Sequence, residues 1–204
     1  MTSPKDGSPI VTNDPLWLAS ASPRRQALLK QIGLTPDKVM PADIDETPAP
    51  RELPQAYAKR MAIEKGKRID LQGGDGAPPY VLSADTVVAV GRRILPKTTT
   101  EEQVRTCLHL LSGRAHRVYT GISLMHADTH LVKIVQSRVH FKRLNEDEIA
   151  WYIDTGDWEG KAGGYAIQGQ AAVFVKSLQG SFSNVVGLPL FETAGLLKGC
   201  GYRF

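Results

Sequence analysis

The chain has 204 residues, of which 42% are hydrophobic and 23% charged, a composition that is ordinary for a globular protein with a substantial core. Its 25 basic and 21 acidic residues give a net charge of +4, which is too small to indicate nucleic-acid binding by itself. The two cysteines have no metal-ligand spacing, and no apolar run reaches the length of a membrane span. We therefore expect a cytoplasmic protein that binds no nucleic acid stably and no membrane.

The chain begins with a polar, proline-rich segment that has no apolar centre for a secretion signal. We expect residues 1–15 to form a disordered tail and residues 16–204 to form a single domain. Helical and strand patterns alternate along the domain, with a strand-rich stretch in the middle, which predicts a mixed α/β fold. Two lobes are compatible with this length, although no segment has the composition of a linker.

The apolar run Leu16–Ser20 predicts a short strand, and a helix is expected to follow it. Ser22 is a typical N-cap, Pro23 suits the first helical position, and Gly33 suits the end. Arg24 and Arg25 then lie in the first turn, where the helix dipole already presents positive charge. Either both are solvated at a small energetic cost, or an anion binds at this helix start and pairs with them.

A second helix is predicted over residues 54–69, with an apolar stripe that includes Met61 and Ile69. Lys65 lies on that stripe, because it follows Met61 by four residues and precedes Ile69 by four. A lysine on an apolar face commonly extends its ammonium group to water, but Lys65 could also point at an anion in a cleft.

The nearly continuous apolar run Tyr80–Val90 predicts a buried strand, and Asp85 lies in its middle. An unpaired buried carboxylate is very unfavourable, so Asp85 needs a cation, a metal or a proton. The alternative is that Asp85 forms a hydrogen bond to a neighbouring turn. We favour a functional role, because Thr86 beside it is also polar.

The second half of the chain continues the alternation of elements. Periodicity and end signals predict helices over 99–113, 145–156 and 188–199, the second of them with an Asn145–Glu148 capping box. Paired strands are predicted over 116–126 and 131–144, and a strand with a turn over 171–182. His116, which lies between a helix and a strand, is interpreted as structural.

A glycine-rich segment, "GKAGGYAIQGQ", follows the helix over 145–156. Glycines allow the backbone to approach a ligand closely, and Gln168 offers both a donor and an acceptor to a nucleobase edge. By itself the pattern is weak evidence, because it matches neither a P-loop nor a dinucleotide fingerprint.

Taken together, the motifs resemble the Maf family of nucleoside triphosphate pyrophosphatases. The matching stretches span most of the chain, from about Leu16 to Leu190, and are "LASASPRR", "DIDE", "YAKRMAIEKGK", "SADTVV", "LSGRAHRVYTG", "GKAGGYAIQGQ" and "NVVGLPL". The resemblance implies a mixed twisted sheet flanked by helices, with two lobes around a deep cleft, as in inosine triphosphatases. It also implies hydrolysis of a nucleoside triphosphate to the monophosphate and pyrophosphate with Mg²⁺ or Mn²⁺, and a homodimer.

The resemblance also carries residue roles onto the matching positions. Asp85 corresponds to the active-site carboxylate, and the family's other charged cleft residues correspond to Arg25, Glu46, Lys65 and Lys97. Positions associated with substrate choice correspond to Arg24, Thr86 and Gln168. We add Ser22 and Lys161 as candidate substrate-binding residues, because they lie in the helix start and in the glycine-rich segment.

The run "KAGGYAIQG" resembles the branch that acts on dTTP and UTP, and the branch that acts on 7-methyl-GTP lacks it. Two departures from the family pattern are Pro96-Lys97-Thr98, where a lysine-proline pair is common, and Gly163-Gly164-Tyr165, where the branch often has Gly-Ala-Tyr. The expected substrates are dTTP, UTP and modified pyrimidine nucleotides.

The hypothesis that follows places the triphosphate at the arginine helix and a divalent cation on Asp85 and Glu46. Asp85 could alternatively activate the attacking water as a base. The competing hypothesis is a non-catalytic nucleotide-binding regulator of septum formation. The acidic pair favours the enzyme, because a simple phosphate binder has little use for carboxylates among its cations.

Overall fold

The computed structural model describes residues 14–69 and 77–203, and most of the tail predicted over residues 1–15 lies outside that range. The elements follow one another along the chain as β1 (Leu16–Ala19), α1 (Pro23–Gln31), β2 (Lys38–Val39), α2 (Pro54–Lys67), β3 (Tyr80–Val90), β4 (Arg93–Ile94), α3 (Glu101–Leu111), β5 (Ala115–His126), β6 (Thr129–Phe141), α4 (Glu146–Asp154), the 3₁₀ helix η1 (Gln170–Phe174), β7 (Val175–Gln179), α5 (Phe182–Val186) and α6 (Leu190–Gly199).

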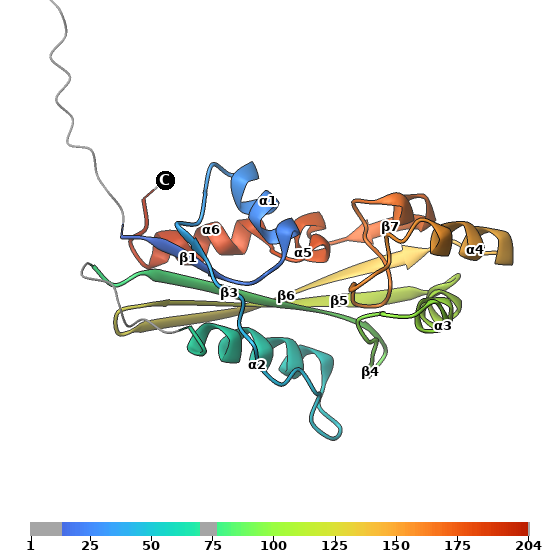
Figure 1. Ribbon diagram of the computed structural model, residues 1–204, viewed down its shortest axis with the longest axis horizontal. Helices are drawn as coiled ribbons and strands as arrows, with labels where there is room; N and C mark the ends of the chain where they lie inside the picture. The colour runs from blue at the N-terminus through green and yellow to red at the C-terminus, as the bar shows by residue number, and fades with distance from the viewer. Residues whose placement is uncertain (1–13, 70–76, 204) are drawn as a thin grey trace, which may run out of the picture.

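One mixed sheet organises the molecule, with the strand order β2-β1-β3-β5-β6-β7 and with β4 paired to β3. β1 lies parallel to β2 and β3, whereas β3, β5, β6 and β7 are successively antiparallel. Helix α2 covers one face of the sheet, and α1, α5 and α6 cover the other (Figure 1). These features confirm the predicted α/β class with a mixed sheet flanked by helices.

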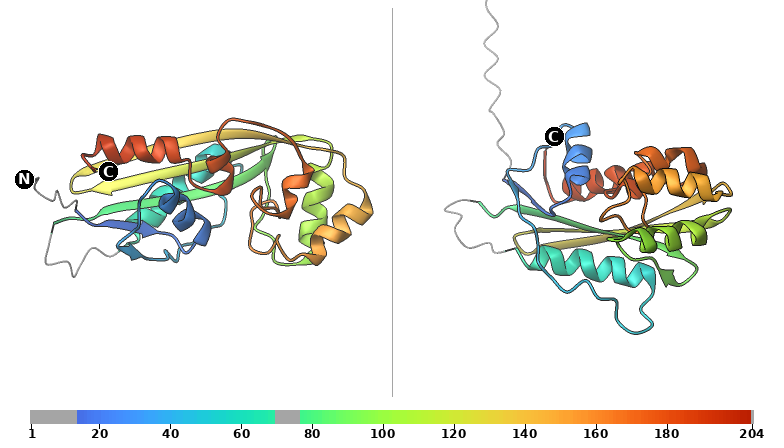
Figure 2. Two further views of the ribbon diagram at one scale, coloured as in Figure 1. Left: turned by 90° about the horizontal axis from the view of Figure 1, so that it is seen from above. Right: turned by 45° about the vertical axis from the view of Figure 1, so that its right-hand side comes forward.

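Two lobes share the long strands β3, β5 and β6, as the views in Figure 2 show. The first lobe has a core between β1, β3, α1 and α6, which includes Leu16, Leu29 and Leu196. The second lobe has a core between α3, α4 and the glycine-rich segment, which includes Leu108 and Tyr152. Because the sheet is continuous through both cores, the lobes are joined by strands and need no linker.

Most predicted elements are present, and several end where the sequence indicates. Ser22 is the N-cap of α1, although its side chain accepts no capping hydrogen bond, and Asn145 forms the predicted capping box with Glu148. The prediction of a strand from residue 171 was wrong at its start, because residues 170–174 form η1 before β7 begins. The short elements β2, β4 and α5 were not predicted. In the described part of the chain, no helix is long and apolar enough to cross a bilayer.

The edge of β3 that faces β1 is paired at both ends and open in the middle. β1 pairs with Tyr80–Ser83, and β4 pairs with Ala89 and Val90 on the same edge, since β5 occupies the other. Among the described residues, no strand pairs with this edge between Ser83 and Ala89. The notch that results lies at the carboxyl end of β1, where ligand sites of α/β sheets usually form, and it contains Asp85.

Candidate active site

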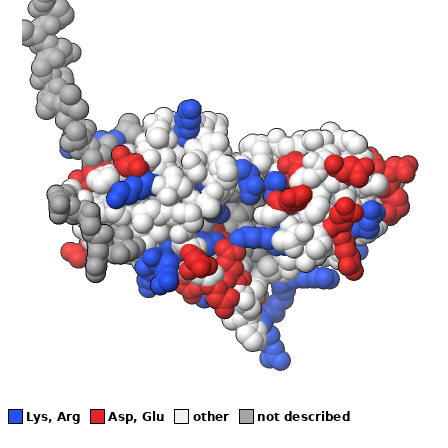
Figure 3. Space-filling view, viewed as in Figure 1, with Lys and Arg blue, Asp and Glu red and all other residues white. Residues whose placement is uncertain are grey.

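A cavity of about 370 Å³ occupies the notch between the two lobes. Figure 3 shows the hollow on this face, with basic and acidic side chains meeting at it. The start of α1, the middle of β3 and the glycine-rich segment form its walls. All ten residues singled out from the sequence line this cavity: Ser22, Arg24, Arg25, Glu46, Lys65, Asp85, Thr86, Lys97, Lys161 and Gln168.

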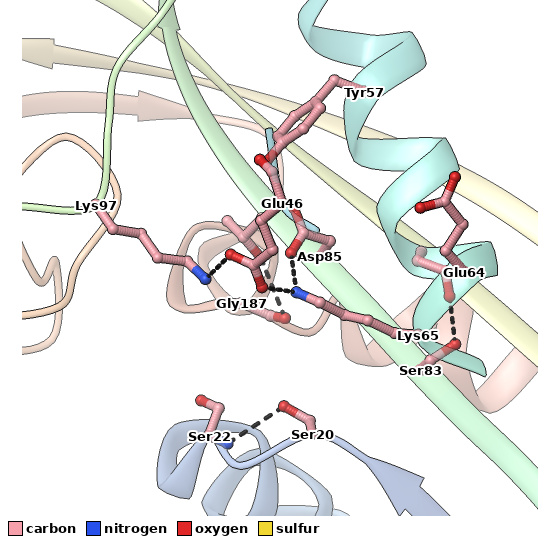
Figure 4. A network of polar contacts seen from close by, with 12 residues as sticks. Ser20, Ser22, Glu46, Tyr57, Glu64, Lys65, Ser83, Asp85, Lys97 and Gly187 are labelled. Carbon is pink, nitrogen blue, oxygen red and sulfur yellow. Dashed lines mark hydrogen bonds and ion pairs between the residues drawn. The ribbon is translucent and has the colours of Figure 1, made fainter. Parts of the chain in front are cut away.

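Four of these side chains form a chain of alternating charge across the cavity. Lys65 Nζ lies 2.5 Å from Asp85 Oδ1 and 2.7 Å from Glu46 Oε1, and Lys97 Nζ pairs with Glu46 Oε2. Figure 4 shows Lys65 and Lys97 pointing at Glu46 from opposite sides. Lys65 comes from α2 of the first lobe and Lys97 from the loop before α3, so Glu46 bridges the cleft.

The buried ammonium group of Lys65 settles the choice left open by the sequence. Lys65 is only 7% exposed and Asp85 only 4%, so this lysine does not extend to water. The approach of α2 to the sheet depends on Gly121 of β5, where a Cβ would lie 2.3 Å from the Ala58 carbonyl oxygen of α2. A glycine at that position lets α2 pack closely enough for Lys65 to reach Asp85.

The Glu46 carboxyl is held ionised by its two lysines. Burial raises its pKa, but hydrogen bonds from Lys65 and Lys97 outweigh that effect and lower it to about 2. The loop that carries Glu46 is anchored to α2, because the Tyr57 hydroxyl donates to the Glu46 carbonyl at 2.5 Å. Arg60 holds the same loop through Glu52 at 2.7 Å.

Arg25 explains how a cation is tolerated at the start of α1. Its Nε donates to the Gly187 carbonyl at 2.9 Å, and its Nη1 donates to Ser20 Oγ at 2.8 Å. Burial lowers the pKa of Arg25, an effect that the Asp85 carboxylate opposes. The guanidinium stays charged, because arginine titrates far above neutral pH. The groups that hold the Arg25 guanidinium in place belong to the protein itself, and the cavity beside the guanidinium has room for an anion.

Thr86 faces the opposite side of β3 from Asp85, because side chains alternate along a strand. Its hydroxyl lies 3.0 Å from that of Thr120, the residue directly opposite on β5. Thr120 is fully buried and donates to the Asn184 carbonyl of α5 at 3.0 Å. The sequence motifs "LSGRAHRVYTG" and "NVVGLPL" include Thr120 and Asn184, but their link to Thr86 was not predicted, since the tertiary structure brings the three together.

The glycine-rich segment is docked onto the residues around Lys97. Thr98 N donates to the Lys161 carbonyl at 3.2 Å, and Gly163 N donates to the Pro96 carbonyl at 2.9 Å. Lys161 Nζ lies 3.5 Å from Asp157 Oδ1. These bonds place Lys161 in the same wall of the cavity as Lys97, while Gln168 lies exposed at its rim.

His116 anchors a further wall residue that the sequence did not indicate. His116 Nε2 and the Tyr165 hydroxyl lie 2.8 Å apart, and Tyr165 lines the cavity. Burial lowers the pKa of His116 to about 4, and the nearby His140 acts in the same direction. His116 is therefore neutral at physiological pH and supports Tyr165 from within the second lobe, as its interpretation as structural predicts.

The fold and the cavity define a mixed α/β protein with a charged cleft between two lobes. The chain belongs to the Maf family, since residues 15–200 match the model of the Maf-like protein family. It is 54% identical over 192 residues to a dTTP/UTP pyrophosphatase of Mesorhizobium japonicum, covering 92% of both chains. It is 56% identical over 195 residues to one of Maricaulis maris, covering 95% of this chain and 92% of that one.

The chain is also 55% identical over 190 residues to a dTTP/UTP pyrophosphatase of Caulobacter vibrioides, covering 92% of this chain and 96% of the relative. Among solved structures, a HAM1 protein from Coxiella burnetii aligns with a TM-score of 0.49 and 16% identity. That alignment covers 92% of this chain and 100% of the other. At that similarity, the alignment is no evidence for a shared activity.

Proposed function

We propose that this protein is a nucleoside triphosphate pyrophosphatase that hydrolyses dTTP and UTP to the monophosphate and pyrophosphate. The observation that carries the proposal is the pairing of Lys65 with Asp85 and Glu46 inside the cavity that also contains Arg25. The cations of such a site can bind a polyphosphate, and a carboxylate beside them can orient the water that attacks a phosphorus atom. The relatives named above, which match this chain almost end to end, support the choice of nucleotide.

The basic residues of the cavity bind the triphosphate in this proposal. Arg24 and Arg25 lie in the first turn of α1, where free backbone N–H groups and the helix dipole also favour an anion. Ser22 precedes them at the N-cap position. Lys65 and Lys97 complete the set from the other walls. Their positive charge stabilises the charge that develops on the phosphoryl oxygens as the leaving group departs.

The hydrolytic step transfers the nucleotidyl group from pyrophosphate to water. A water oxygen forms a bond to the α-phosphorus, the bond from that phosphorus to the bridging oxygen breaks, and pyrophosphate leaves with the bond electrons. The Asp85 carboxylate orients this water and accepts its proton. Lys65 keeps Asp85 in place, because its ammonium group lies 2.5 Å from Asp85 Oδ1.

The carboxylates of the site fit a divalent cation. Asp85 and Glu46 both contact the same ammonium nitrogen, so the two carboxylates face the same part of the cavity. No group of three or more potential metal ligands was found among the described residues. Two carboxylates with substrate phosphates are the usual arrangement for Mg²⁺, and Mn²⁺ suits the same ligands. When bound, the ion neutralises phosphate charge and polarises the α-phosphoryl group.

The nucleobase is recognised at the rim of the cavity in this proposal. Gln168 can bond to the O4 and N3–H edge that thymine and uracil share, and cytosine reverses the donor and acceptor there. Arg24, Thr86 and Lys161 lie in the same cavity and contribute to substrate choice. A pocket separates thymine from uracil by only about 1–3 kcal/mol, so both nucleotides and modified pyrimidines are accepted.

Three further features belong to the proposal. The protein acts as a homodimer, and it is cytoplasmic. It is an enzyme rather than a non-catalytic regulator of septum formation, because the Lys65–Asp85 pair would add nothing to a simple nucleotide binder.

Pyrophosphate release from a panel of triphosphates tests the proposal. The purified protein with Mg²⁺ should release pyrophosphate from dTTP and UTP faster than from CTP or purine nucleotides, and a chelator should stop the reaction. Asp85→Asn should lower kcat by at least a hundredfold, whereas Asp128→Asn in the exposed turn after β5 should leave it unchanged. Tight nucleotide binding without turnover by the parent protein would refute the proposal.

A further inference from the structure

The hydrogen bonds around Thr86 have a direction that the donors and acceptors determine. The Asn184 carbonyl can only accept, so the Thr120 hydroxyl, 3.0 Å away, donates its single proton there. This carbonyl needs that donor, because Leu188 N, four residues further along the chain and beyond the end of α5, donates to the Ser183 carbonyl instead, at 2.9 Å. A buried carbonyl without a partner would be unfavourable.

The proton of Thr86 is committed to the protein as a consequence. Its hydroxyl lies 3.0 Å from Thr120 Oγ1 and 3.4 Å from the Gly187 carbonyl oxygen. Since Thr120 has already donated its proton, Thr86 is the donor in their shared bond, and it is equally the donor in the longer bond to Gly187. In both arrangements the oxygen of Thr86 has only lone pairs left for other partners.

The groups around Thr86 agree with that assignment. Arg25 Nη2 lies 3.5 Å from Thr86 Oγ1, at the limit of hydrogen-bond range, and arginine can only donate. The Thr86 hydroxyl therefore accepts hydrogen bonds from a ligand and does not donate them. The register of the sheet builds this arrangement, because Thr86 and Thr120 are directly opposite on β3 and β5.

We propose that Thr120 is a positioning residue that makes Thr86 a one-way acceptor, so that Thr86 selects nucleotides presenting a hydrogen-bond donor. The inference rests on the proposed function and deepens it. Phosphate oxygens carry no proton at neutral pH, so the donor belongs to the nucleoside. It is either the N3–H of thymine and uracil or the 3′-hydroxyl of the sugar, and acceptor-only groups at the same place are rejected.

The test uses Thr120→Val, which keeps the shape of the side chain and removes the hydroxyl, with Thr120→Ser as the matched control that retains it. For each variant, the ratio of kcat/KM is measured for UTP over CTP and for dTTP over its 3′-fluoro analogue, whose substituent can only accept. In Thr120→Val, the long 3.4 Å contact with the Gly187 carbonyl is the remaining protein bond of the Thr86 proton that the described structure shows, and a ligand acceptor can displace it. One of the two ratios should fall about tenfold, the discrimination expected of one hydrogen bond.

The outcome identifies the donor, because a fall in the first ratio points to the base and a fall in the second to the sugar. Thr120→Ser should keep both parental ratios. In a Thr86→Val background, Thr120→Val should change neither ratio further, since Thr120 acts through Thr86. If Thr120→Val keeps both ratios within twofold of the parent, the inference is overturned.

Two further measurements separate this inference from folding defects and from the proposed function. If Thr120→Val does not fold, the same two ratios are measured in Thr86→Val instead. Unchanged ratios in that variant overturn the inference. The same ratios are also measured as Kd values of the corresponding monophosphates. A parent protein that binds but does not hydrolyse would then count against the proposed function alone, while the Kd ratios still test Thr120.

Discussion

Lys65 offers the sharpest test of the electrostatics of the site. Its ammonium group lies 2.5 Å from Asp85 and 2.7 Å from Glu46, and the Lys65 and Asp85 side chains are only 9% and 6% exposed. Lys65→Met keeps the aliphatic length and removes the charge. Two carboxylates then face each other without the cation they share, and breaking a buried pair in this way costs about 3–5 kcal/mol.

The expected result is a large loss of thermal stability. For a chain of this size, each kcal/mol lowers the midpoint by about 2–4 °C, so the midpoint should fall by about 6–20 °C in calorimetry. Lys67→Met is the matched control, because Lys67 is an exposed lysine on the same helix. Its free energy of unfolding should stay within about 0.5 kcal/mol of the parent value.

Two further readouts distinguish electrostatics from packing. Mg²⁺ should raise the midpoint of Lys65→Met more than that of the parent protein, because the cation replaces the missing charge between Asp85 and Glu46. Turnover of dTTP should fall by about 10²–10³-fold, as for other lost transition-state contacts. A midpoint within 2 °C of the parent, or equal stabilisation of both proteins by Mg²⁺, would refute the reasoning.

The remaining predictions concern pH and packing. The pKa of Glu46 is lowered from 4.5 to about 2, so its contribution to stability is complete above pH 4.5 and is lost as the pH falls toward 2. In Glu46→Gln, the free energy of unfolding measured with a chemical denaturant should therefore depend less on pH across that window. An unchanged pH dependence would contradict this prediction. The pKa of His116 is lowered from 6.5 to about 4, so the parent should lose on the order of 3 kcal/mol between pH 6.5 and 4. His116→Phe should be less stable than the parent at pH 8, but it should lose less stability between pH 6.5 and 4. An equally steep loss in the variant would show that His116 is not the source of the pH dependence. Gly121→Ala should lower both the thermal midpoint and activity, because its Cβ would meet the Ala58 carbonyl oxygen at 2.3 Å, while Gly195→Ala has open space in α6 and should be neutral or stabilising. Equal midpoints for these two variants would show that close packing of α2 is unimportant.

The sequence by itself determines the elements whose signals are local. The bounds of β3 were predicted residue for residue, and the capping box of α4 was predicted from Asn145 and Glu148. Residues that interrupt these local patterns also identify the site. Asp85 interrupts an apolar strand and Lys65 interrupts an apolar stripe, and both lie in the cavity. A charged residue in a buried pattern needs a partner, so it marks a site before the partner is known.

The short elements could not be predicted because their stability is not local. β2 and β4 have two residues each and form only because neighbouring strands supply their hydrogen bonds. α5 has five residues, too few for a stable isolated helix, and depends on contacts such as those of the buried Asn184. The sequence of residues 170–174 is apolar enough for a strand, but the structure closes it into a 3₁₀ turn.

Only the tertiary structure decides which charged groups meet. The sequence indicates Lys65, Lys97, Glu46 and Asp85 separately, and the fold pairs Lys65 with both carboxylates while Lys97 reaches Glu46 across the cleft. Likewise, no local pattern links Thr86 to Thr120, which the register of two antiparallel strands places opposite each other. The physical reason is that residue type and spacing determine which groups are costly to bury, whereas distances between remote segments depend on how sheet and helices pack.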